Sequence, residues 1–272
     1  MQLALCNKAL EHLPLEAFFE LAAEAGFELV ELAPETLRTS LIEPDYSLRV
    51  QILQVARAHG LRIIGFNSIF AHTPDLALVT RDRAQRERSS QMLVALIELT
   101  AEWCGPIMVI GSPRQRRRPN GATFDEAADL FIEGLRAACD RAAERDVAVC
   151  LEPLVAELTD FMNDTEEAIA IIQRMNHPAL RLVLDVKQMA REGPSFGALI
   201  ERGAPWLGHF HANDANREAP GEGETDFRPI LRRLRAAGYD GIVSIEAFAF
   251  RGDPAQILRR SHDYLAECLQ AL

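Results

Sequence analysis

Hydrophobic residues along the chain follow two alternating patterns. Short, continuous apolar runs are each followed by a longer segment in which apolar residues recur at spacings of three and four. The first pattern is typical of strands in a parallel sheet covered on both faces, and the second is typical of amphipathic helices. Predicted strands lie within 2–7, 27–34, 61–67, 107–113, 147–154, 180–187, 207–214 and 241–248. Predicted helices lie within 15–26, 47–60, 83–105, 124–146, 165–175, 195–203, 227–239 and 253–269.

Capping residues support the ends of these helices. Asp164 and Asp253 stand where an N-cap is expected, because their side chains can accept hydrogen bonds from the first free backbone N–H groups. Glycine, which readily adopts the left-handed conformation that closes many helices, precedes several predicted strands. These glycines are Gly26, Gly60, Gly105 and Gly238.

The regular succession of strand and helix defines the expected fold. Strand–helix units without a break in composition predict a single α/β domain over residues 1–272, closed into a (β/α)₈ TIM barrel. An open doubly wound sheet would show the same alternation, but no G-x-G-x-x-G follows the first strand. We therefore expect the barrel.

Composition limits the classes of function. A net charge of -11 argues against non-specific binding to nucleic acid. The five cysteines are scattered and contain no C-x-x-C, which favours free thiols in a reducing compartment. The chain shows neither a leader pattern nor an apolar run of the ~20 residues that cross a bilayer. We expect a cytoplasmic protein that acts on a small molecule, with no membrane partner.

Four metal-binding side chains recur at one kind of place. Glu152, Asp185, His211 and Glu246 each stand at the far end of one of the last four apolar runs. The carboxyl ends of parallel strands meet on one rim of a barrel, where the active sites of this fold lie. Two glutamates, an aspartate and a histidine form an oxygen-rich ligand set suited to Mn²⁺ or Mg²⁺.

Taken singly, each of these residues has a structural explanation. Glu152 could be an exposed strand-end carboxylate, Asp185 a turn cap, His211 a packed core histidine and Glu246 an ion-pair partner. Together they would place like charges close to one another, which is costly without a cation. The set as a whole therefore predicts one divalent metal.

Several blocks around these residues resemble a known superfamily. The segments LEPL, TDFMND, LVLDVKQM, HFHANDAN, PGEGETDF and GIVSIEAF occur in the order seen in the xylose isomerase-like TIM barrels, a superfamily of sugar isomerases and epimerases. In the isomerase and epimerase branches, the residues that match Glu152, Asp185, His211 and Glu246 bind one divalent metal, often Mn²⁺, and Mg²⁺, Co²⁺ or Zn²⁺ would also fit. The two glutamates then exchange protons with a carbon beside a carbonyl, through a metal-stabilised enediolate.

The segments after the first two ligands depart from one branch. In the ketohexose 3-epimerases, the segment that begins at the first ligand resembles E-x-L-N-R-x-E. This chain has Val155, Ala156 and Leu158 at the sugar-contacting positions of that segment. Gln188 replaces a histidine that follows the metal-binding aspartate in those enzymes. Arg217 matches a substrate-contacting arginine of the epimerases and could equally be a solvated loop charge. These differences speak against a simple free-ketohexose 3-epimerase.

The endonuclease branch fits poorly. Its members use three zinc ions and additional histidines, including an Asp-Arg-His element. This chain reads ANREAPGEG at that element, and its third and fourth predicted strands end near Asn67 and Ser112 in place of histidine. One metal site is predicted, and a trinuclear site is not.

Further residues are candidates for substrate contact. Asn7 and Asn67 end the first and third predicted strands, and His72 lies in the loop after the third. Lys187 and His209 stand two residues from a predicted ligand, so strand alternation points both into the barrel.

The loop 111–121 is rich in arginine, of which Arg116 is our choice if one faces the site. A packed or ion-paired role is an equal or stronger explanation for each of these further residues.

The expected function is that of a divalent-metal-dependent isomerase or epimerase. Its substrate would be a sugar, a sugar phosphate or a related keto-polyol, bound as a small carbohydrate-like molecule. The alternative is a lyase or dehydratase that removes the same proton and then eliminates a leaving group. A homo-oligomer is compatible with either function.

Overall fold

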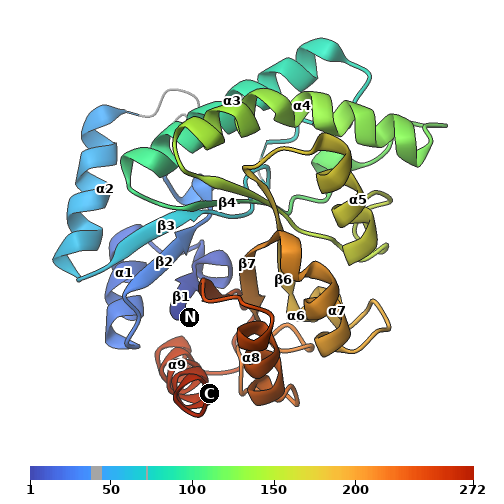
Figure 1. The fold of residues 1–272 in the computed structure, drawn as a ribbon. Helices are drawn as coiled ribbons and strands as arrows, with labels where there is room; N and C mark the ends of the chain where they lie inside the picture. Colours follow the sequence, from blue (N-terminus) through green and yellow to red (C-terminus); the bar gives the residue numbers. More distant parts are fainter. Residues whose placement is uncertain (38–44, 72) are drawn as a thin grey trace.

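The eight predicted strands form a closed barrel. The computed structural model describes residues 1–37, 45–71 and 73–272, and each strand pairs in parallel with its sequence neighbours until β1 meets β8 (Figure 1). Closure through β1 and β8 rules out the open doubly wound sheet and confirms the predicted single TIM barrel. The strands are β1 (Gln2–Cys6), β2 (Leu29–Leu32), β3 (Arg62–Phe66), β4 (Ile107–Ile110), β5 (Ala148–Leu151), β6 (Leu180–Asp185), β7 (Leu207–Ala212) and β8 (Ile242–Ile245).

Helices surround the barrel in chain order. The α-helices are α1 (Leu15–Glu24), α2 (Tyr46–Ala58), α3 (Arg83–Glu102), α4 (Phe124–Glu144), α5 (Thr165–Met175), α6 (Val186–Met189), α7 (Phe196–Gly203), α8 (Phe227–Ala236) and α9 (Pro254–Gln270). Short 3-10 helices occur at Lys8–Leu10, Pro34–Leu37, Arg114–Arg116 and Ala204–Trp206. The one-turn helix α6 begins inside the predicted strand segment 180–187, because the strand ends at Asp185 and the chain turns at once. No helix in the described ranges is long and apolar enough to cross a membrane.

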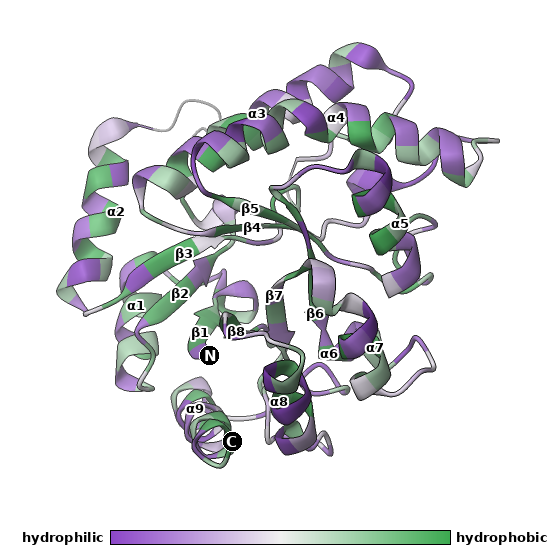
Figure 2. Ribbon diagram, in the orientation of Figure 1, coloured by the Kyte–Doolittle hydropathy of each residue, from purple (hydrophilic) through white to green (hydrophobic). Residues whose placement is uncertain are grey.

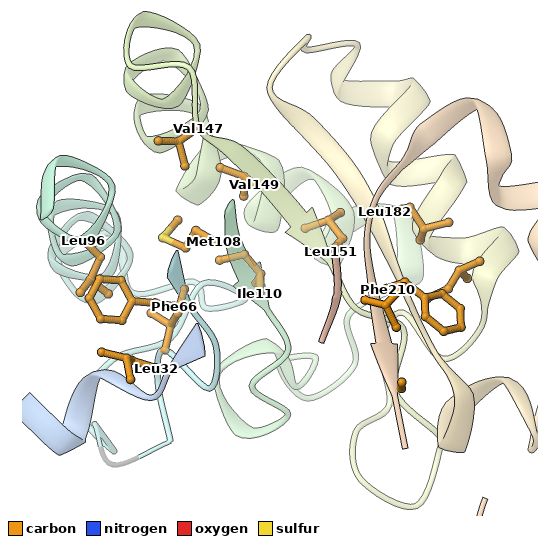
Figure 3. Packing of buried hydrophobic residues seen from close by; sticks show 14 of the residues in the cluster. Leu32, Phe66, Leu96, Met108, Ile110, Val147, Val149, Leu151, Leu182 and Phe210 are labelled. Carbon is orange, nitrogen blue, oxygen red and sulfur yellow. The ribbon is translucent and has the colours of Figure 1, made fainter. Parts of the chain in front are cut away.

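Most of the core lies between the barrel and the helices. The strands are mainly apolar, while the helices alternate apolar with polar residues (Figure 2). Figure 3 shows Leu96 of α3 beside Phe66 and Leu32 of the barrel wall. The ring of Phe66 also meets Trp103, with 5.6 Å between the ring centroids. Burial of these apolar side chains is the main force that holds helices against strands.

A second, smaller core fills the inside of the barrel. It contains Ala4, Leu29, Ile64, Ile107, Val109, Cys150 and Val183. Successive side chains of a strand point to opposite faces, so the residue two positions further along the same strand also points inward. Cys150 and Val183 therefore set the direction of Glu152 and Asp185. The interior changes from apolar to charged along the barrel axis.

The predicted caps are confirmed at most positions and wrong at one. Asp164 accepts a hydrogen bond from the N–H of Glu167, and Asp253 accepts one from Ala255. Gly105 does not close its helix, because Cys104 takes the left-handed conformation instead, with φ of 60°. Gly105 is needed for another reason, since a Cβ there would lie 2.7 Å from the carbonyl oxygen of Ile64. The remaining predicted caps have positive φ angles, at Gly26, Gly60 and Gly238.

Gly65 allows β3 and β4 to approach, and its replacement tests this part of the barrel. Its φ is 148°, and a Cβ would lie 1.8 Å from the carbonyl oxygen of Ile107. We expect Gly65→Ala to lower the free energy of unfolding by about 2–3 kcal/mol, measured by urea denaturation. Gly197→Ala in α7, where the nearest atom to a Cβ is 3.6 Å away, should leave stability unchanged or raise it. Equal effects of the two substitutions would contradict this explanation.

Candidate metal centre

The structure brings the four predicted ligands together at the carboxyl rim of the barrel. Glu152 follows β5, Asp185 ends β6, His211 lies in β7 and Glu246 follows β8. All four side chains are buried, and one ligand atom from each lies within 4.8 Å of the others. Residues far apart in the sequence therefore form one compact cluster of three carboxylates and an imidazole.

Local structure holds these side chains in place. Asp185 Oδ1 accepts a hydrogen bond from the backbone N–H of Gln188. Asp185 therefore caps the following turn, as one of its two explanations predicted, and also belongs to the cluster. Asn213 donates to Asp185 Oδ2 over 2.6 Å, and its own Oδ1 accepts from the backbone N–H of Lys187. Asn67 donates to Glu246 Oε1. These hydrogen bonds restrict the rotation of the Asp185 and Glu246 carboxylates and of the Asn213 amide.

The absence of a side chain at Gly111 gives Glu152 its space. A Cβ at position 111 would lie 1.9 Å from Glu152 Oε2, well inside the van der Waals distance. Gly111 directly follows β4, beside the strand that carries Glu152. A larger residue would force the carboxylate away from the cluster.

Lys187 is the cation at the centre of the cluster. Its Nζ lies 2.9 Å from Asp185 Oδ2, 3.3 Å from Glu246 Oε2 and 3.7 Å from Glu152 Oε1. Burial alone would favour the neutral amine, but the three carboxylates raise the pKa of Lys187 above its ordinary value. One ammonium group thus faces three acidic groups.

The environments of the two glutamates differ. Burial raises the pKa of Glu152 well above its ordinary value, and the neighbouring Glu246 and Asp185 raise it further against the opposing effect of Lys187. Burial would also raise the pKa of Glu246, but Lys187 and His211 outweigh it and bring that pKa below its ordinary value. The two carboxyl groups therefore differ in their affinity for a proton, which is higher at Glu152 than at Glu246.

The position of His211 is compatible with a metal ligand. Its Nδ1 lies 3.3 Å from Glu246 Oε2 and 3.9 Å from Asp185 Oδ2, yet it forms no aligned hydrogen bond within the described part of the chain. A buried nitrogen without a partner, facing carboxylate oxygens, is suited to ligating a metal ion. A divalent cation would also offset the excess of negative charge that Lys187 leaves.

A cavity of about 650 Å³ opens above the cluster. Four residues predicted to contact substrate line it, namely Asn67, Lys187, Gln188 and Arg217. Gln188 accepts a hydrogen bond from the backbone N–H of Val155, while its Nε2 has no partner among the described residues. The guanidinium of Arg217 lies 5.1 Å from the ring centre of Phe248, and its backbone is left-handed with φ of 76°.

Part of the cavity wall is apolar. Val155 and Leu158 line it from the loop after β5, and Leu158 is 42% exposed. Phe248 also lines it from the loop after β8, with Lys187 Nζ 4.1 Å from its ring centre. The cavity lining thus combines apolar side chains with the charged groups of the cluster.

The other predicted contact residues lie away from the cavity lining. Arg116 is buried and donates from Nη1 to the backbone oxygen of Glu152, and burial lowers the pKa of its guanidinium to about 10. Asn7 accepts from the backbone N–H of Ala33 and holds the start of the loop after β2. His209 lies one layer below His211. His72 falls outside the described residues.

Two residues at the site were missed by the sequence reasoning. Asn213 holds Asp185, and Glu31, in β2, contacts both His209 and His211 within the barrel. The alternation of Leu29 and Glu31 along one strand is a signal that could have revealed the second of these. It would have placed a carboxylate inside the barrel.

The chain belongs to the xylose isomerase-like TIM barrel family, whose sequence profile matches residues 19–268. It is 30% identical over 233 residues to the ketose 3-epimerase of Arthrobacter globiformis, covering 83% of this chain and 75% of that enzyme. It is 28% identical over 255 residues to the putative hydroxypyruvate isomerase of Mus musculus, covering 89% and 87%. The match to the D-psicose 3-epimerase of Agrobacterium fabrum is 32% identical over 130 residues and spans less than half of each chain, 47% and 45%.

Solved structures share the fold. A crystal structure of D-psicose 3-epimerase in the presence of D-fructose superposes with a TM-score of 0.85 and covers 99% of each chain. The sequence identity is 20%, so this comparison bears on the fold alone. The two chains therefore share the same barrel fold over almost their whole length.

Replacement of Gly111 tests the geometry of the cluster. The Cβ in Gly111→Ala would displace the Glu152 carboxylate, which is the flexible end of a side chain, so the fold should persist. We expect the affinity for Mn²⁺, measured by calorimetric titration, to fall about tenfold or more. Losses of this size are typical when a group that supports a metal ligand is changed. Gly197→Ala is the control, and wild-type affinity in Gly111→Ala would contradict the placement of Glu152.

Proposed function

We propose that this protein is a divalent-metal-dependent isomerase or epimerase of a sugar, a sugar phosphate or a related keto-polyol. The observation that carries the proposal is the convergence of Glu152 and Glu246 on the floor of the cavity, with Lys187 between them. The ketose 3-epimerase and hydroxypyruvate isomerase names of the relatives support the same class of reaction.

The metal in this proposal is a single ion held by Glu152, Asp185, His211 and Glu246. Three carboxylates and one imidazole suit Mn²⁺ best, and Mg²⁺, Co²⁺ and Zn²⁺ are further candidates. When bound, such an ion would polarise substrate oxygens and stabilise the negative charge that forms when the neighbouring carbon loses its proton.

The two glutamates have different tasks. Glu246 accepts hydrogen bonds from Asn67 Nδ2 and Lys187 Nζ, which stabilise its negative charge. In this proposal it is the base that takes a proton from the substrate carbon. Glu152 has Lys187 at the longer distance of 3.7 Å and is the acid that returns a proton. Removal of a proton from one face of the substrate carbon gives the enediolate, and return of a proton to the opposite face inverts that carbon.

The remaining cavity residues orient the substrate. Lys187 reaches the carboxylates and stands where an oxyanion would develop. The free Nε2 of Gln188 is a donor for a hydroxyl or carbonyl oxygen, and Arg217 supplies a second donor from the rim. Val155 and Leu158 offer apolar surface at positions where the pattern of the ketohexose 3-epimerases is more polar. The part of the substrate that contacts these two residues therefore differs from a free ketohexose.

Solvent exchange tests the proton transfer. We expect wild-type enzyme with Mn²⁺ in D₂O to place deuterium on a substrate carbon, within a panel of free and phosphorylated ketoses and hydroxypyruvate. Glu246→Gln and Glu152→Gln should each slow the exchange by about 10²- to 10⁴-fold. Glu20→Gln on the exposed face of α1 is the matched control. Release of water or of another leaving group, with an alkene product, would instead identify a lyase or dehydratase.

Chelation tests the requirement for metal. EDTA should abolish turnover, and Mn²⁺ should restore it more fully than Mg²⁺, Co²⁺ or Zn²⁺. Because the ion binds the folded cluster, Mn²⁺ at 100 times its dissociation constant should add about 2.7 kcal/mol to the free energy of unfolding. Full activity after complete removal of metal, verified by elemental analysis, would contradict the proposal.

A further inference from the structure

A buried carboxylate lies beneath the metal centre and has no part in the proposed proton transfer. Glu31 belongs to β2, is fully buried and is not among the residues that line the cavity. Its Oε2 lies 3.4 Å from His209 Nε2 and 3.3 Å from His211 Nε2. The hydroxyl of Ser244 donates to the same oxygen over 2.8 Å.

Closure of the barrel brings these groups together. His209 and His211 lie in β7 and Ser244 in β8, so each contact with Glu31 spans about 180 residues or more of sequence. A carboxylate this deeply buried is costly to keep in the folded protein unless donors surround it. Two imidazoles and one hydroxyl provide them.

The chemistry of the carboxylate fixes the hydrogens of both imidazoles. An ionised carboxylate only accepts hydrogen bonds, so each histidine must carry a hydrogen on the Nε2 that faces Glu31. A neutral imidazole with its hydrogen on Nε2 has a lone pair on Nδ1. In His211 that nitrogen faces Glu246 and Asp185 and lacks a hydrogen-bond partner within the described ranges.

We propose that Glu31 is a positioning residue for the metal centre. It holds the hydrogen of His211 on Nε2 and fixes the ring, so that the Nδ1 lone pair is directed at the ion. His209 Nε2 and the Ser244 hydroxyl occupy further acceptor positions of the carboxylate, while its contact with His211 fixes the ligand ring. This inference rests on the metal centre of the proposed function, and it adds a residue that contacts neither the ion nor the substrate.

A second ion held by Glu31, His209 and His211 is the competing explanation, because their ligand atoms also lie within 4.8 Å of one another. The structure favours the hydrogen-bonded network for two reasons. Ser244 already donates to the carboxylate, and all three candidate ligands are fully buried with no place in the cavity lining. The number of ions bound per chain separates the two explanations.

The test compares Glu31→Gln with Ser244→Ala in the full-length protein. An amide has one accepting oxygen and one donating nitrogen, so Gln cannot offer acceptors to both histidines. We expect Glu31→Gln to bind Mn²⁺ roughly 10- to 100-fold more weakly than wild type. Ser244→Ala keeps both histidine contacts and should remain within about threefold of wild type. Circular dichroism of the metal-free proteins checks that each variant is folded.

Three results would overturn the inference. The first is wild-type Mn²⁺ affinity in Glu31→Gln. The second is two ions per wild-type chain and one in Glu31→Gln, by elemental analysis, which would make Glu31 a ligand. The third is an equal loss of affinity in Ser244→Ala. Because the readout is metal affinity, a protein that binds Mn²⁺ but converts no sugar would refute the proposed function and leave the role of Glu31 standing.

A second measurement needs no variant and decides the question if Glu31→Gln does not fold. Nitrogen NMR of the wild-type protein with labelled histidine, loaded with diamagnetic Mg²⁺, reports which ring nitrogen carries hydrogen. We expect hydrogen on Nε2 of both His209 and His211. Hydrogen on Nδ1 of either ring would overturn the inference.

Discussion

Repulsion among three buried carboxylates is the constraint on which this site depends. Glu152, Asp185 and Glu246 share one end of the barrel, and each pair would separate if the scaffold allowed it. Lys187 contacts all three, and His211 faces two of them. This partial compensation leaves an excess of negative charge that a divalent cation can neutralise.

The scaffold withstands this repulsion because its lower interior is filled by packed side chains. Apolar side chains such as Val109, Cys150 and Val183 fill the barrel below the cluster, and the helices bury the outer faces of the same strands. Strand geometry then delivers each acidic side chain two residues beyond a packed one. Asn67 and Asn213 complete the fixation with hydrogen bonds. The three carboxylates and Lys187 are thus held at the carboxyl rim of the barrel.

The sequence was sufficient for the barrel and for the four side chains at its rim, because both depend on local pattern. Continuous apolar runs identify the strands. Glu152 and Glu246 each stand directly after one of these runs. Glu31 escaped prediction because it lies inside the run FELVELAP, and its partners are about 180 residues away. Cys104 took the helix-closing conformation expected of Gly105, because Gly105 must pass close to Ile64.

Loop side chains were the least predictable part. Arg116 was our choice if one arginine of its loop faces the site. Its guanidinium is buried and donates to the backbone oxygen of Glu152, a direction that depends on the packed loop and not on spacing. Gln188 and Arg217 reach the cavity because short turns after β6 and β7 place them there. Periodicity describes regular elements and carries no information about such turns.

Anomalous diffraction from crystals containing Mn²⁺ tests the central claim most directly. The account predicts one strong peak per chain, about 2.1 Å from oxygen atoms of Glu152, Asp185 and Glu246 and from Nδ1 of His211. A peak coordinated by other residues, or none at saturating Mn²⁺, would contradict it.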